Sequence, residues 1–317
     1  MNSKTKSISV VIPVYGCKKA LPELCDRLEK TLDPMTRNYE IVLVNDACPQ
    51  NSWETIQSLC EKNKKIKGIE LSRNFGQMKA ILAGLDYSTG DYVVVMDCDL
   101  QDKPEEIPNL FNKLNEGFDI VFAKRAIRKD KKRKIFIAKL FYKFYSFSIG
   151  QKYDPDLCNF SIMTRDVVDA YCKMREEHRA FVMYLQWLGF KQTSIVVEHA
   201  PRKSGKSSYS FKKRLKLALE ILLSQSDKFL RLIVGLGIIM SILSIIAIIV
   251  LVICYITIPA QVPGWTSTIV TICLIGSINI SVTGIVGLYV GNIFVQVKER
   301  PLYVIRTILN NNKEEDK

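Results

Sequence analysis

The sequence predicts an α/β fold, with a mostly parallel β-sheet covered by helices on both faces and a C-terminal pair of membrane-spanning helices. Two observations support this prediction. Short β-branched runs alternate with longer helical patterns over residues 7–124. The composition then changes abruptly, because residues 1–228 carry nearly all of the charge and residues 232–297 carry none. A chain of 317 residues has room for one large domain and such an appendage.

Short apolar runs with the composition of buried strands alternate with amphipathic segments in the first part of the chain. The expected strands are Ile8–Val14, Glu40–Asn45, Ile66–Ser72, Tyr92–Met96 and Ile120–Ala123. The expected helices are Leu21–Leu32, Ser52–Asn63, Gln77–Tyr87 and Glu105–Asn115. Ligands bind at the carboxyl ends of the strands in such sheets, so functional residues should directly follow strands.

Two uncharged segments, Leu232–Ile258 and Trp265–Val297, follow the charged part of the chain. Each exceeds the roughly 20 residues that cross a bilayer, which predicts transmembrane helices at about 230–258 and 265–290. Basic residues flank the pair on both outer sides, and no signal peptide precedes the first strand. We therefore expect a multi-pass protein of the inner or plasma membrane, with both termini and the first domain in the cytoplasm. Gly287 and Gly291 form a small-residue pair that is compatible with a homo-oligomer.

The composition divides the chain into four parts. They are a cytosolic domain at 1–208, a juxtamembrane amphipathic helix at 209–228, the two transmembrane helices within 229–297, and a cytosolic tail at 298–317. Residues 125–150 interrupt the β–α alternation with a basic cluster followed by an aromatic-rich run. A solvated loop and core helix would explain this segment, and so would an interfacial amphipathic helix, which the neighbouring spans favour.

The net charge of +13 predicts anionic partners. Basic clusters lie on the way to the apolar segments, which favours membrane lipids and a phosphorylated substrate over nucleic acid. The nine cysteines show no metal-ligand spacing and there are only two histidines, which argues against a zinc site. Because the cysteines are odd in number and scattered, we expect them to be reduced in a cytosolic domain.

The most informative local pattern is Asp97-Cys98-Asp99-Leu100-Gln101-Asp102, directly after the fourth expected strand. Two carboxylates at this spacing can converge on one hard divalent cation. Such a cation would bridge a diphosphate and neutralise charge on a nucleotide leaving group. A solvated turn is the alternative, and the position at the carboxyl end of a strand favours the metal.

Two other strands end in residues suited to binding a nucleotide. Val44-Asn45-Asp46 ends the second strand, where the acid could accept hydrogen bonds from a base or ribose, or cap the next helix. Pro13-Val14-Tyr15 ends the first strand, where the tyrosine ring could lie against a base.

Four ordered motifs, Val11–Tyr15, Val44–Asp46, Ser72–Gly76 and Met96–Asp102, together resemble those of glycosyltransferase family 2. More narrowly, the chain is similar to the polyprenyl-phosphate glycosyltransferases, the group of dolichol-phosphate mannose synthase and bactoprenol glucosyltransferase. The resemblance covers the whole chain, including the two apolar segments and the ending Val297–Tyr303. It implies a GT-A fold, a UDP- or GDP-sugar donor, a Mg²⁺ or Mn²⁺ ion, a polyprenyl-phosphate acceptor and inversion at the anomeric carbon.

The resemblance also implies roles for individual residues. Catalytic roles fall to Asp99, Asp154 and Asp156, of which Asp154 is preferred over Asp156; an Asp-Pro turn is the alternative there. Metal ligands would be Asp97, Asp99 and Gln101. The nucleotide sugar would contact Pro13, Tyr15, Asp46, Asn74, Lys79, Asp97 and Arg202. A basic Arg-x-x-Gly-x-Ser segment would bind the lipid phosphate through Arg202, Lys203, Lys206 and Ser207.

The chain departs from the family pattern at two places. Asp46-Ala47-Cys48-Pro49 replaces the usual Asp-Gly-Ser, and Gly16-Cys17 stands where an acidic residue often follows the first-strand tyrosine. These differences concern the contacts to the base and the sugar, not the class of reaction.

The expected function is transfer of a sugar from a nucleotide diphosphate to polyprenyl phosphate at the cytoplasmic membrane face. An alternative acceptor is a sugar hydroxyl of a lipid-linked oligosaccharide, which needs a general base and would make Asp154 or Asp156 essential. An alternative of another class is a non-catalytic membrane subunit that binds nucleotide sugar, against which the intact Asp97, Asp99 and Arg202 argue.

Overall fold

The computed structural model describes residues 6–125, 154, 156–177, 180–197 and 264–311, together with separate positions between 235 and 257. The described residues belong to two compact units. One unit contains the residues before 144, those of 151–210 and those from Pro301 onward, and the other contains residues 144–150 and 211–300.

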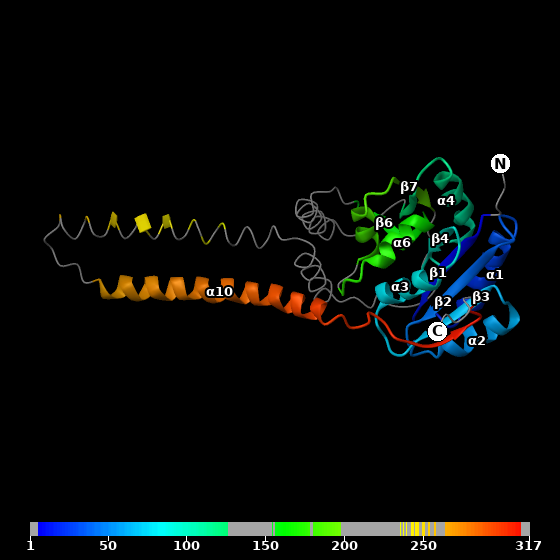
Figure 1. Cartoon of the computed structure of the whole chain (residues 1–317), viewed down its shortest axis with the longest axis horizontal. Coiled ribbons are helices and arrows are strands. Elements are labelled where there is room, and N and C mark those ends of the chain that lie inside the picture. Colours follow the sequence, from blue (N-terminus) through cyan, green and yellow to red (C-terminus); the bar gives the residue numbers. More distant parts are fainter. Residues whose placement is uncertain are drawn as a thin grey trace. The chain divides into compact units, whose positions relative to one another are not determined.

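An eight-stranded sheet with the order β7-β5-β6-β4-β1-β2-β3-β8 forms the centre of the first unit (Figure 1). Strands β1 to β4 are mutually parallel, β6 is antiparallel to both β4 and β5, and β8 is antiparallel to β3. The strands are β1 (Ile8–Val14), β2 (Tyr39–Asn45), β3 (Ile66–Leu71), β4 (Tyr92–Val95), β5 (Ile120–Arg125), β6 (Leu157–Thr164), β7 (Gln192–Val197) and β8 (Ile305–Leu309). The predicted mostly parallel sheet is confirmed.

Helices cover both faces of this sheet, because every central strand is apolar on both sides. Side chains alternate along β1, so Ile12 joins one core cluster with α1, α2 and α4 while Val11 joins the other with α3, α6 and α7. The helices are α1 (Leu21–Leu32), α2 (Ser52–Lys62), α3 (Gln77–Tyr87), α4 (Ile107–Leu114), α6 (Arg165–Lys173) and α7 (Phe181–Trp187), with a 3-10 turn at Pro104–Glu106. The predicted elements of the first 124 residues are all present, with small differences at their ends.

The order of the central strands creates a topological switch point. From β1 the chain builds β2 and β3 on one side and then places β4 on the other side of β1. Open α/β sheets bind ligands at the carboxyl ends of their strands beside such a switch point. Gly84 allows α3 to pack closely beneath this point, because a Cβ there would lie 2.3 Å from Cγ1 of Val11.

The segment after the last helix is part of the sheet. A cytosolic tail separate from the first domain was expected at 298–317, whereas β8 pairs with β3 along its edge. The Asn310 amide donates to the carbonyl oxygens of Cys60 and Ile66, both at 2.8 Å. Tyr303 and Arg175 both bond to Asp86 of α3. A short edge strand far from its partner in sequence gives no local signal, which is why the composition placed this segment outside the domain.

The second unit contains the long apolar helix α10 (Trp265–Val297). Its part Leu274–Val297 has 24 residues, a mean hydropathy of 1.7 and no buried residues, so its length and composition suffice to cross a bilayer. Most of the first predicted span lies outside the described residues, although separate positions from Gly235 to Thr257 have helical backbone. The segments 126–150 and 209–228 also lie outside the described residues. The two-helix hairpin therefore stays a prediction.

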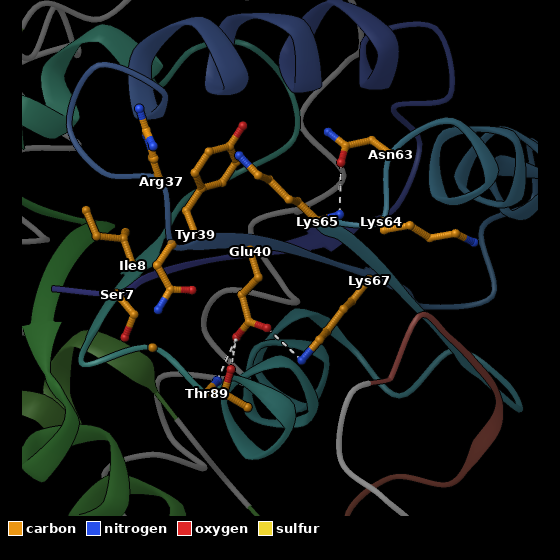
Figure 2. A pocket seen from close by; sticks show the side chains of 12 residues that line it. Ser7, Ile8, Arg37, Tyr39, Glu40, Asn63, Lys64, Lys65, Lys67 and Thr89 are labelled. Carbon is orange, nitrogen blue, oxygen red and sulfur yellow. Dashed lines mark hydrogen bonds and ion pairs between the residues drawn. The ribbon is translucent and has the colours of Figure 1, made fainter. Parts of the chain in front are cut away.

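A buried ion pair closes the amino-end edge of the sheet. Glu40 of β2 lies 2.6 Å from Nζ of Lys67 on β3, and the two side chains are 12% and 4% exposed. Ser9 Oγ and the Thr89 N–H each donate to Glu40 at 2.6 Å. Burial alone would raise the pKa of Glu40, but the bonds from Lys67, Ser9 and Thr89 outweigh it and hold that pKa below its ordinary value. This network lines a hollow of about 350 Å³ at the edge opposite the strand carboxyl ends (Figure 2).

Replacing Lys67 with methionine should destabilise the first unit by about 3 kcal/mol, because Glu40 would lose its buried counter-charge. Since the pKa of Glu40 is lowered in the folded state, its stabilising effect is present above the unfolded pKa and lost as the pH falls through the folded value. Lys67→Met should therefore weaken this acid dependence. Urea denaturation of the detergent-solubilised chain at several pH values measures both effects. The control, Lys62→Met at an exposed position of α2, should behave as the wild type; equal stability of both variants would contradict the prediction.

Candidate active site

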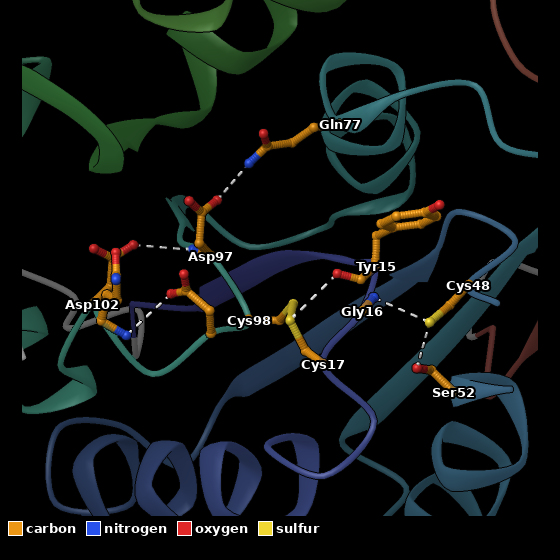
Figure 3. Close-up of a disulfide and its surroundings, with 11 residues drawn as sticks. Tyr15, Gly16, Cys17, Cys48, Ser52, Gln77, Asp97, Cys98 and Asp102 are labelled. Atoms are coloured by element: carbon orange, nitrogen blue, oxygen red, sulfur yellow. Dashed lines mark hydrogen bonds between the residues drawn. A yellow bond between two sulfur atoms is a disulfide. The ribbon is translucent and has the colours of Figure 1, made fainter. Parts of the chain in front are cut away.

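The predicted site residues follow three strands that lie side by side. Val14 of β1 is in register with Asn45 of β2, and Val11 of β1 with Val95 of β4. Because the three strands are parallel, the residues after them, Tyr15, Asp46 and Asp97, lie at one edge of the sheet. Figure 3 shows Tyr15 and Asp97 at this edge. Tyr15 is 52% exposed, which leaves its ring open to a ligand.

The turn from Asp97 to Asp102 is held by its own carboxylates. The Asp97 N–H donates to Oδ2 of Asp102 at 3.1 Å, and the Gln101 N–H donates to Oδ1 of Asp99 at 3.1 Å. Leu100 has a φ of 62°, a left-handed conformation that is unfavourable for leucine. Leu100 and Asp102 are both 5% exposed, so burial of the first and hydrogen bonding of the second hold the backbone there.

Gln77 is a site residue that the sequence did not reveal. It begins α3, and its Nε2 donates to Oδ1 of Asp97 at 2.7 Å. Gly76 precedes it with a φ of 94°, a conformation that favours glycine. The bond orients one of the two predicted metal-binding carboxylates. The only signal in the sequence was its position directly after the Ser72–Gly76 motif.

Asp46 holds the turn that precedes α3. Its carboxylate oxygens accept the N–H groups of Phe75 at 2.7 Å and Gly76 at 2.9 Å, and the residue is 3% exposed. Burial raises the pKa of Asp46, and the two N–H groups and nearby Arg73 offset only part of this effect. Asp46 therefore caps the turn before α3, which contains Asn74, and not α2, the helix that follows Asp46 in the chain. Contact of Asp46 with the base stays a prediction.

Two further predicted residues have partners of opposite charge. Lys79 of α3 pairs with Glu177. Asp154 accepts from Nζ of Lys124 at 2.7 Å and from the Asp156 N–H at 3.0 Å. The hydrogen bond to Asp154 raises the pKa of Lys124. A catalytic role for either acid and the alternative of an Asp-Pro turn both stay predictions.

Strand directions bring these acids to the same edge as Asp97. Strand β6 is antiparallel to β4 and β5, so Asp154 and Asp156, which precede it, lie at the edge where β4 and β5 end. Strand β7 is parallel to β5 and ends at Val197. The chain therefore enters the basic segment from this edge. The four residues predicted to bind the lipid phosphate, Arg202, Lys203, Lys206 and Ser207, lie outside the described residues.

The cysteine prediction is wrong for one pair. Cys17, after β1, and Cys98, after β4, form a disulfide with a Cα–Cα distance of 6.1 Å. They are 81 positions apart in the sequence, so only the pairing of β1 with β4 shows their proximity. Nearby, the free Cys48 thiol accepts from the Gly16 N–H and the Ser52 hydroxyl (Figure 3). Burial raises the pKa of Cys48, but these bonds and further backbone donors outweigh burial and lower it.

The donor set fits a divalent cation that is held partly by substrate. Among the described residues no group of three or more His, Cys, Asp or Glu side chains could bind a metal alone. Mg²⁺ and similar hard cations, however, are commonly held by one or two carboxylates together with substrate phosphates and water. Asp97 and Asp99 supply such oxygen donors. The part of Gln101 in metal binding stays a prediction.

Comparison with known proteins identifies the family. Residues 9–183 match the model described as Glycosyl transferase family 2. The chain belongs to glycosyl transferase family 2. An uncharacterised glycosyltransferase of Synechocystis sp. is 36% identical over 302 residues, covering 95% of each chain. The prophage bactoprenol glucosyl transferase homolog of Escherichia coli is 31% identical and covers 95% of this chain and 99% of its own.

A solved structure agrees with this assignment at the level of the fold. Mannosyl-3-phosphoglycerate synthase from Rubrobacter xylanophilus superposes with a TM-score of 0.50, at 12% sequence identity, over 69% of this chain and 73% of the other. The expected GT-A-type α/β fold is thus confirmed, and this family 2 glycosyltransferase is an enzyme.

Asp46→Asn should destabilise this glycosyltransferase by about 1–3 kcal/mol, because one of the two backbone N–H groups would face an amide NH₂ instead of an oxygen. The turn before α3 should loosen, and binding of UDP or GDP should weaken. Urea denaturation and titration calorimetry measure the two effects. The matched control is Asp26→Asn on the exposed face of α1, which should change neither. Wild-type stability of Asp46→Asn would show that these two hydrogen bonds do not hold the turn.

Proposed function

We propose that this enzyme transfers a sugar from a nucleotide diphosphate to the phosphate of a polyprenyl lipid at the cytoplasmic face of a membrane, with inversion at the anomeric carbon. One observation carries the proposal. Three features share one edge of the sheet: the Asp97-x-Asp99 turn, the Lys124–Asp154 pair and the end of β7, after which the basic segment follows in the sequence. The same chain has a long, exposed apolar helix.

The donor would bind at the edge of the sheet where β1 and β4 end. Tyr15 offers a face to the base, and Asp97 and Asp99 would hold a Mg²⁺ or Mn²⁺ ion against the diphosphate. The ion, when bound, would neutralise the charge that develops on the leaving nucleotide. Gln77 keeps Asp97 oriented, and Asp102 keeps the turn in its strained conformation. Fixed donors of this kind act without reorganisation during the reaction.

A lipid phosphate suits this site as the acceptor. A phosphate oxygen already carries charge, so it needs no general base and catalysis depends on alignment. The main difficulty is repulsion between two phosphorylated substrates, which Lys124 and the basic residues at 202–206 would offset. A hydroxyl acceptor would need Asp154 to accept a proton, whereas Asp154 is already bonded to Lys124 and to the Asp156 N–H. The name of the Escherichia coli relative, a bactoprenol glucosyl transferase homolog, also supports a polyprenyl acceptor.

Strand pairing supports the proposed two-helix membrane hairpin. Strands β1 to β7 precede the apolar segments and β8 follows them, yet β8 pairs with β3 in the same sheet. A chain that starts and ends in one sheet must cross a membrane an even number of times. If α10 crosses once, a second crossing is required earlier, and the uncharged segment Leu232–Ile258 is long enough to provide it.

A donor screen tests the reaction. Purified enzyme, undecaprenyl phosphate, Mn²⁺ or Mg²⁺ and a panel of UDP- and GDP-sugars should give one lipid-phosphate-sugar by mass spectrometry. A chelator should abolish the product, and Asp99→Asn should lower the rate about 100-fold or more, because charge on the leaving group would be less stabilised. The control Asp166→Asn, exposed on α6, should keep full activity.

Two outcomes would contradict parts of this proposal. Nucleotide-sugar binding without transfer to any polyprenyl phosphate would favour the lipid-linked oligosaccharide acceptor, with Asp154 as base. Binding without transfer to any lipid acceptor would favour a non-catalytic binding subunit.

Membrane topology gives a separate prediction. An epitope tag inserted after Gln261 should be exposed on the outer face of intact cells, and a tag after Lys317 should be exposed only in inverted vesicles, because the even number of crossings returns the chain to the cytoplasm. Antibody labelling of both preparations measures this directly. Finding both tags on the same side would contradict the hairpin.

A further inference from the structure

The three sulfur atoms at the switch point are unusual in their placement. Cys17 follows β1, Cys48 follows β2 and Cys98 follows β4, so one cysteine leaves each of the strands that form the site (Figure 3). Cys98 separates the two carboxylates predicted to bind the metal. The other cysteines in the described part of the chain, apart from the membrane-helix segment, are Cys25, Cys60, Cys158 and Cys172.

The bridge between Cys17 and Cys98 lies on the α1 face of the sheet. Cys98 is 5% exposed and belongs to the core cluster on the α1 face, and Cys17 packs against the same cluster. Asp97, one residue earlier, instead points toward Gln77 of α3 (Figure 3). The disulfide and the Asp97 carboxylate thus lie toward opposite faces of the sheet, and the disulfide joins the two loops that would hold the ligand.

Formation of the Cys17–Cys98 disulfide restrains the loops on both sides of the proposed donor site. On one side Cys17 is two residues from Tyr15, and the Gly16 N–H between them is bonded to Cys48 Sγ at 3.1 Å. On the other side Cys98 lies in the turn that contains Asp97, Asp99 and the left-handed Leu100. A covalent link between these loops reduces the freedom that ligand binding would otherwise have to remove.

We propose that Cys17 and Cys98 form a reversible redox site whose oxidised form binds the nucleotide and its metal more tightly than the reduced form. The inference rests on the donor site proposed above. Disulfides of cytoplasmic domains exchange with cellular thiols, and those found there are commonly transient or redox-sensing. A pair built into the metal-binding turn would make sugar transfer respond to the thiol pool.

The exchange partner would be a low-molecular-weight thiol or a dithiol protein. A partner thiolate attacks Sγ of Cys17, the more accessible sulfur, forming a mixed disulfide and releasing the Cys98 thiolate. A second partner thiol then attacks the partner's sulfur in the mixed disulfide, which releases the Cys17 thiolate and the partner disulfide. Two electrons pass from the partner to the cysteine pair, and the released thiolates take protons from water. The reverse sequence restores the bridge.

Linkage makes the proposal measurable without any transfer assay. If the oxidised form binds nucleotide more tightly by some factor, nucleotide must favour the oxidised form by the same factor. The full chain in detergent is equilibrated in glutathione redox buffers, with and without Mn²⁺ and UDP, and alkylated. Peptide mass spectrometry then gives the fraction of Cys17–Cys98 disulfide. We expect the ligands to raise its equilibrium constant about 5- to 10-fold, and reduction to weaken UDP binding by a similar factor in calorimetry.

Matched variants separate this site from the neighbouring thiol. Cys17→Ser should bind UDP as the reduced wild type does, whatever the redox buffer, whereas Cys48→Ser should keep the full redox response. The proposal is overturned if oxidised and reduced wild type bind UDP and Mn²⁺ equally, if the ligands leave the disulfide fraction unchanged, or if oxidation links Cys17 to Cys48 instead. Failure to glycosylate any lipid would count against the proposed acceptor alone, because both readouts here are binding and disulfide content.

Discussion

Parallel pairing of β1 with β2 on one side and β4 on the other determines where the functional residues of this enzyme lie. Backbone hydrogen bonds fix the register, so the chain leaves all three strands at the same edge. The helices that follow these three strands, α1, α2 and α4, pack on one face of the sheet, whereas α3, which precedes β4, packs on the other. Tyr15, Asp46 and Asp97 are brought together by this topology, without any attraction between their own side chains.

The antiparallel strand β6 extends this edge into a second half of the site. Its reversed direction brings Asp154 and Asp156 to the edge where β4 and β5 end, although they precede β6 in the chain. The pairing of Asp154 with Lys124 then places one positive charge at the same edge as the acidic turn. Acidic groups suited to a cation and a basic group suited to a phosphate therefore share one edge, as the proposed transfer between two phosphorylated substrates would require.

The last strand connects the apolar helix to the catalytic unit. Strand β8 covers the outer edge of β3, and Asn310 satisfies two backbone carbonyl groups there. Covering an edge strand in this way also protects it from pairing with other chains. The bonds from Tyr303 and Arg175 to Asp86 join the returning chain to α3, whose first residue, Gln77, orients Asp97. The C-terminal segment is thus structurally connected to the site although it contributes none of the predicted site residues.

The sequence by itself determined the positions of the strands and helices in the first 124 residues, because hydrophobic period and β-branched composition are local properties. It also located Asp46, Asp97 and Asp99 at strand ends and identified the family through four ordered motifs. Only the tertiary structure decided that Asp46 caps the turn before α3, that Gln77 orients Asp97, that β8 completes the sheet and that Cys17 meets Cys98. Each of these contacts joins residues that are distant in the chain, and their proximity depends on strand order and register, which no local pattern encodes.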